Sequence, residues 1–129
     1  MKVGVDSIDQ EHRVIVEQYA ILYEKMRGDQ NGDHYNALVG FLKFYVQSHM
    51  IHEEALQKEI GYPNFQEHKA SHDEFRDLIQ EILTAYQHEP PGTEELIQVS
   101  ETVQRWLHAH IDHYDRQLGQ FYHERFETV

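Results

Sequence analysis

The spacing of histidines and carboxylates constrains the fold of this chain more than any other feature. His49 and Glu53 are four residues apart, and so are His68 and His72. On an α-helix, residues four apart stand on one face, one turn above another, so each pair can offer two ligands to the same metal site. Helical bundles place metal ligands in their cores in this way. The two pairs therefore predict helices that face a common interior.

The candidate ligands outnumber what one metal ion needs. Five histidines and two carboxylates occur at suitable spacings on four stretches of the chain: His12, His49, Glu53, His68, His72, His110 and Asp115. Taken alone, one such pair is more often a surface accident or an adventitious zinc site. Four linked sets argue against accident, and seven ligands are about right for two metal ions.

The composition narrows the choice of metal. Because the 129 residues include no cysteine, disulfides, thiolate sites and iron–sulfur clusters are excluded. A metal held by nitrogen and oxygen would be zinc, iron, manganese, copper or nickel. The eleven histidines would also suit a pH-sensing or merely polar surface, and it is their spacing that favours a metal site.

The charge of the chain bears on its partners. A formal net charge of −12 repels a phosphate backbone and anionic lipid alike, so neither nucleic acid nor a membrane surface is expected as a partner. No secretory signal and no apolar run of about 18 residues is readable in the sequence. A cytoplasmic protein is therefore expected.

Hydrophobic periodicity predicts four helices and no strand. The helices are expected at about 7–27, at 34–60 with Asp33 as N-cap, at 65–87 with Asn64 as cap, and at 93–118. Turn-rich segments at 28–33, 61–63 and 88–92 separate them. Long helices joined by short loops predict an all-α, up-down-up-down antiparallel four-helix bundle, with residues 1–129 forming a single domain.

In such a bundle the candidate ligands meet at one level. His12 lies near the start of the first helix and His49 late in the second, whereas His68 lies early in the third and His110 late in the fourth. Because alternate helices run in opposite directions, all four positions fall near the same end of the bundle. The sequence thus predicts a metal centre in the bundle core.

One spacing does not fit a regular helix. His110 and Asp115 are five residues apart, which places them about 140° from each other around an α-helix. His108 and Asp112 would be the conventional pair. Either a local π-bulge or a carboxylate that reaches inward from the flank would bring Asp115 to the centre.

The motifs of the chain resemble those of the bacterial hemerythrins. The resemblance covers nearly the whole chain and rests on these motifs: Asp9-Gln10-Glu11-His12, His49-x-x-x-Glu53-Glu54, Gly61-Tyr62-Pro63, His68-x-x-x-His72 and Trp106-Leu107-x-x-His110-Ile111-x-x-x-Asp115. It implies a non-haem centre of two iron ions that binds dioxygen reversibly at one open iron.

The resemblance also implies a role for each ligand. His68, His72 and His110 would complete one iron, and His12 and His49 would hold the other. Glu53 and Asp115 would bridge the two ions together with a solvent-derived oxo or hydroxo group. Trp106 and Leu107 resemble the oxygen-pocket residues of the family, although ordinary core packing explains them as well.

Several functions are compatible with this centre. The protein would be an oxygen carrier, a store, or a sensor that reports to a fused or partner signalling domain, and it would not be an enzyme. The alternatives are a di-iron enzyme with peroxidase or nitric oxide-handling activity, and simple iron or zinc binding. The chain contains no Glu-x-x-His, which weakens a ferroxidase or hydroxylase reading.

The chain departs from the family pattern at three places. Met50 follows the second ligand histidine where an aromatic residue is common, and Gln57 stands where a methionine is common. No tryptophan-bearing arm precedes the first helix, which suggests either a short variant or part of a longer protein. Glu54 is expected to be solvated or to support a ligand. His52 and His113 are expected on the solvated helix surface, the alternatives being that they support a ligand or act as ligands themselves. His34, His88, His108 and His123 are expected on the surface.

Overall fold

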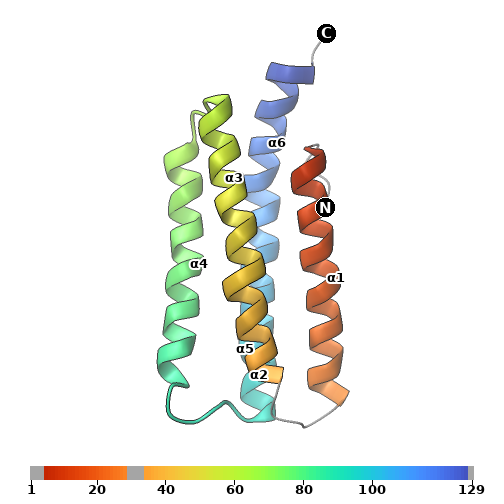
Figure 1. Ribbon diagram of the computed structural model, residues 1–129, viewed down its shortest axis with the longest axis vertical. Helices are drawn as coiled ribbons and strands as arrows, with labels where there is room; N and C mark the ends of the chain where they lie inside the picture. Colours follow the sequence, from red (N-terminus) through yellow and green to blue (C-terminus); the bar gives the residue numbers. More distant parts are fainter. Residues whose placement is uncertain (1–4, 29–33, 128–129) are drawn as a thin grey trace.

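The computed structural model describes residues 5–28 and 34–127, which form four helical rods that run side by side in alternating directions (Figure 1). The rods are α1 (Asp6–Gly28); the continuous run of α2 (His34–Gly40), η1 (Phe41–Val46) and α3 (Gln47–Ile60); α4 (Phe65–Ala85); and the continuous run of α5 (Thr93–His110), η2 (Ile111–Asp115), α6 (Arg116–Tyr122) and η3 (His123–Glu127). The η segments are π-helical, and the described residues contain no strand. The predicted antiparallel four-helix bundle is confirmed.

The turn between α3 and α4 explains why the second rod ends where it does. Gly61 has a φ of 68° in the left-handed region, which glycine adopts without a steric penalty. The N–H of Tyr62 then donates to the carbonyl of Gln57 over 2.9 Å, and Pro63 cannot continue the helix. Asn64 precedes α4 as predicted, but its side chain makes no capping hydrogen bond. The predicted cap Asp33 lies outside the described residues.

The apolar core is divided by a polar layer. Along α1, Ile8 belongs to a small apolar cluster with Tyr62 and Leu118, whereas Ile15 belongs to the main cluster further along the bundle. His12 lies between these two positions and is itself buried. A set of buried polar side chains is therefore closed on both sides by apolar packing. Within the described residues, no helix is long and apolar enough to cross a membrane.

Candidate metal centre

The seven predicted ligands meet in this polar layer. Each is at most 5% exposed, and together they form what we term the buried cluster: His12 on α1, His49 and Glu53 on α3, His68 and His72 on α4, His110 at the end of α5, and Asp115 at the end of η2. They come from all four rods. The predicted convergence at one level of the bundle is thus what the structure shows.

The buried cluster divides into two overlapping groups, each of which could hold a metal ion. The three-histidine group contains His68, His72 and His110, the two-histidine group contains His12 and His49, and both groups share Glu53 and Asp115. Within each group, one ligand atom from every residue lies within 4.8 Å of all the others. The arrangement offers two adjacent metal positions with both carboxylates in common.

Each shared carboxylate offers one oxygen to each group. Oε1 of Glu53 lies 2.6 Å from Nε2 of His68, and Oε2 lies 3.3 Å from Nε2 of His49. Oδ1 of Asp115 lies 2.9 Å from Nε2 of His68, and Oδ2 lies 2.9 Å from Nε2 of His12. A carboxylate divided in this way can bridge two cations.

A π-helical turn resolves the five-residue spacing. η2 begins directly after His110 and ends at Asp115. Because a π-helix bonds residue i to residue i+5, residues five apart stand over one another. Nε2 of His110 accordingly lies 3.2 Å from Oδ1 of Asp115, while His108 and Asp112 are exposed on the outside. Of the two routes open from the sequence, the π-bulge is the one observed.

The buried carboxylates are balanced by positive charge. Burial opposes charging of His49, but hydrogen bonds to Glu11 and Glu53 outweigh it and raise the pKa of His49 to about 10. Burial likewise opposes charging of His68, and Asp115 and Glu53 raise its pKa to about 9. Although burial acts to raise the pKa of Glu53, hydrogen bonds from four histidines hold it well below its usual value. Such a site attracts cations, whether protons on imidazole or metal ions.

Three imidazoles have a partner on their outer nitrogen. Nδ1 of His49 donates to Oε1 of Glu11 over 3.0 Å, and Nδ1 of His72 donates to Oε2 of Glu54 over 2.7 Å. Oγ of Ser71 hydrogen-bonds Nδ1 of His110 over 2.7 Å. Such contacts orient a ligand ring and fix which nitrogen faces the metal. Sequence reasoning considered this role for Glu54 but missed Glu11 and Ser71, although each directly precedes a ligand histidine.

The remaining histidines lie outside the cluster. His88, His108, His113 and His123 are exposed, as is His52, whose Nδ1 donates to Oε2 of Glu11 over 3.0 Å. His34 departs from the surface prediction, because it is half-buried and its Nε2 has no hydrogen-bond partner among the described residues. It is remote from the buried cluster in sequence, at the start of α2.

One of the two expected pocket residues packs on His110, and the other lies in the apolar core. The ring of Trp106 stacks on that of His110, with centroids 4.8 Å apart and an interplanar angle of 11°. Leu107 is buried in the main apolar cluster and, with Ile15 and Ile111, lines a small cavity of about 20 Å³. Trp106 thus contacts the buried cluster, whereas Leu107 is the one of the two that lines this cavity.

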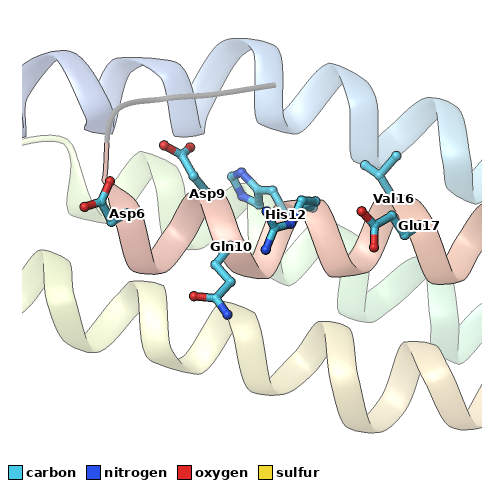
Figure 2. Close-up of a pocket in the computed structure, with 7 residues that line it drawn as sticks. Asp6, Asp9, Gln10, His12, Val16 and Glu17 are labelled. Carbon is cyan, nitrogen blue, oxygen red and sulfur yellow. The ribbon is translucent and has the colours of Figure 1, made fainter.

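Two further features adjoin the buried cluster. Gln57 lies one turn after Glu53 with 0% exposure, and neither amide atom has a hydrogen-bond partner in the described part of the chain. On the other side, an open pocket of about 550 Å³ runs along α1 beside His12 (Figure 2). Asp9 and Val16 also line it. The two-histidine group is therefore the one that adjoins this open pocket.

Comparison with known proteins places the chain in a family. It matches the model described as the hemerythrin HHE cation binding domain over residues 3–122, a span that includes the whole buried cluster. It is similar to a bacteriohemerythrin of Stenotrophomonas maltophilia (strain R551-3), with 31% identity over 111 residues, which are 86% of this chain and 70% of the relative. A bacteriohemerythrin of Clostridium acetobutylicum is 28% identical over 119 residues, covering 90% of this chain and 92% of the relative. No solved structure gave a significant match.

Proposed function

This chain belongs to the hemerythrin family, and we propose that it holds two iron ions and binds dioxygen reversibly at one of them, as a carrier, store or sensor. The observation that carries the proposal is the division of the two carboxylates, each with one oxygen beside the three-histidine group and one beside the two-histidine group. The bacteriohemerythrin names of two relatives support it.

The donor set fits an iron pair. Imidazole nitrogens with carboxylate oxygens, and no thiolate, are ligands that suit iron among the first-row metals. Several of these buried atoms lie close to one another without a hydrogen bond of good geometry in the described residues, among them Nε2 of His12, His68 and His110 and both oxygens of Asp115. Buried polar atoms need a partner, and metal ions would supply it here.

In this proposal the two positions are not equivalent. His68, His72 and His110 would hold one ion, His12 and His49 would hold the other, and Glu53 and Asp115 would be shared between them. A solvent-derived oxo or hydroxo group would complete the bridge. The two-histidine position has four side-chain ligands against five, so it is the position open to a small ligand. When bound, the iron pair supplies the electrons and the open position that reversible oxygen binding needs.

The protein around the cluster holds the ligands and excludes water. Glu11, Glu54 and Ser71 fix three imidazole rings through their outer nitrogens. The apolar clusters on either side, which include Ile15 and Leu118, keep bulk solvent from the centre. The chain thus contributes orientation and a dry surrounding.

Binding without turnover is favoured by the absence of a spare acid. Among the described residues, every fully buried carboxylate and imidazole belongs to the buried cluster itself. No further buried carboxylic acid or imidazole is available to give a proton to a bound ligand. The protein is therefore proposed to be a binder and not an enzyme.

A visible absorption spectrum tests the proposal. The protein is reduced without oxygen, its iron is quantified, and spectra are taken before air, in air and after oxygen is removed under argon. Two irons per chain and a charge-transfer band that appears in air and disappears under argon are expected. Irreversible conversion to a ferric spectrum, or turnover with hydrogen peroxide, would favour the enzymatic alternative, and a lack of iron binding would overturn the di-iron proposal.

A further inference from the structure

The two histidine groups differ in the side chains that hydrogen-bond the outer nitrogens of their imidazole rings. On the three-histidine side, Oε2 of Glu54 contacts both Nδ1 of His72 and a guanidinium nitrogen of Arg76, at 2.7 and 2.9 Å. Arg76 also donates to Oε1 of Gln47 and to Oδ1 of Asp73, each over 2.9 Å. The side chain that orients His72 is thus held by an arginine with three fixed partners on α3 and α4.

On the two-histidine side, the side chain that orients a ligand histidine is part-exposed to solvent. Glu11 on α1 accepts from Nδ1 of His49 with one oxygen and from Nδ1 of His52 with the other, each over 3.0 Å. The side chain of Glu11 is 26% exposed and that of His52 is 65% exposed. Both line an open cleft of about 370 Å³ between α1 and α3. No lysine or arginine of the described residues pairs with Glu11.

We propose that Glu11 is the positioning residue for His49 and that, because this support is part-exposed, the two-histidine position is the weaker and exchangeable one of the two metal positions. The inference rests on the proposed two-metal function and adds an order of loading to it. The three-histidine position fills first and is retained, and the two-histidine position fills second and is lost first.

The physical reason lies in how an outer partner affects a ligand. A carboxylate on the far nitrogen of an imidazole fixes the tautomer and the ring plane and raises the basicity of the nitrogen that binds the metal. A partner that is itself held by a charged neighbour keeps this benefit, whereas a part-exposed one whose other partner is an exposed histidine spends part of its time in other rotamers and is screened by water and salt. Glu54 is of the first kind and Glu11 of the second. The smaller ligand count of the two-histidine group acts in the same direction.

The test is a stepwise metal titration of the metal-free full chain. Iron(II) is added without oxygen in the presence of a competing chelator, and the same titration is made with Zn²⁺. Two matched variants, Glu11→Gln and Glu54→Gln, each remove one carboxylate charge and keep the size of the side chain. For the unchanged chain we expect two affinity classes of one ion each.

The variants should act on different ions. Glu11→Gln should weaken the second, weaker ion by about tenfold to hundredfold and leave the first unchanged, whereas Glu54→Gln should weaken the first. In the Zn²⁺-loaded protein, the downfield Nδ1–H proton resonance of His49 should shift in Glu11→Gln only, which a merely structural change would not produce. Equal loss of both ions in both variants, or an unchanged second ion in Glu11→Gln, would overturn the inference.

Two measurements keep this result separate from other failures. Far-ultraviolet circular dichroism of the metal-free variants identifies a variant that has not folded. The inference is then tested on the other variant, through the Nδ1–H resonance of its His49. If the unchanged chain binds fewer than two ions, the proposed function itself fails. If it binds two ions with equal affinity, only the order of loading proposed here fails.

Discussion

At the scale of single residues, Asp115 joins the two halves of the buried cluster. Its two oxygens lie 2.9 Å from Nε2 of His68 and 2.9 Å from Nε2 of His12, so neither group is complete without it. Asp115→Asn keeps the shape and removes the charge, and we expect it to lower metal content at both positions. The matched control is Asp112→Asn, because Asp112 lies on the same π-helical segment but is exposed. Metal analysis after dialysis compares the two, and a variant of Asp115 that retains both ions would contradict the bridging role.

Gln57 is a polar side chain at a fully buried position. Its amide is fully buried with no hydrogen-bond partner among the described residues, which costs about 1–3 kcal/mol for a polar group. Gln57→Met has nearly the same length and removes the polar atoms. We expect this variant to raise the free energy of unfolding of the metal-free protein by about 1 kcal/mol, measured by urea denaturation. A less stable variant would show instead that the amide has a partner in solution, such as a buried water molecule.

At the scale of elements, one glycine within the second rod and one directly after it should respond to alanine in opposite ways. Gly61 has a φ of 68°, where a Cβ is strained whatever the space around it, so Gly61→Ala should destabilise the protein by about 1–2 kcal/mol. Gly40 has helical angles, with no atom within 4 Å of where its Cβ would lie. Gly40→Ala should therefore stabilise it by about 0.5–1 kcal/mol. Urea denaturation of both variants measures the difference, and changes of the same sign would contradict the assignment of the turn.

The elements also show how far sequence reasoning reaches. The period of apolar residues predicted four helices, and Gly61 with Pro63 predicted where the second rod ends. The π-helix η2, which ends at Asp115, was only one of two alternatives. The five-residue spacing from His110 does not say whether the backbone or the side chain adjusts to bring the Asp115 carboxylate inward. The π-helix η1, at Phe41–Val46, was not anticipated at all.

The outer partners of the cluster were harder still to predict. Glu11 and His49 lie on different rods, and so do Ser71 and His110, so their contacts depend on how the rods are rotated against one another. The period of apolar residues in a single sequence predicts which face of each helix points inward. It does not predict which side chains of neighbouring helices contact one another at the edges of that face. Positions that point inward were therefore predictable, and the contacts that orient them were not.

At the scale of the whole molecule, the buried charges predict how stability depends on pH. In the metal-free protein the pKa of His49 is raised to about 10 and that of His68 to about 9, against 6.5 for an ordinary histidine. A raised pKa in the folded state contributes stability that is fully present below the unfolded pKa and is lost as the pH rises through the folded one. The lowered pKa values of Glu53 and Asp115 act in the opposite sense, because their contribution is lost only in acid as the pH falls through the folded pKa values.

The metal-free protein should therefore be most stable at about pH 5–6.5 and should lose stability steadily towards pH 10. We expect its thermal midpoint to fall by about 5 °C or more over that range, measured by circular dichroism. The metal-loaded protein is the control, because imidazole binds a metal through a neutral nitrogen and the loaded cluster has no imidazolium to lose. Its midpoint should stay nearly constant between pH 6.5 and 9. A metal-free midpoint that is equally insensitive would mean that the histidines of the folded cluster are neutral already near pH 6.5, and that the two carboxylates are balanced by something other than protons on their neighbours.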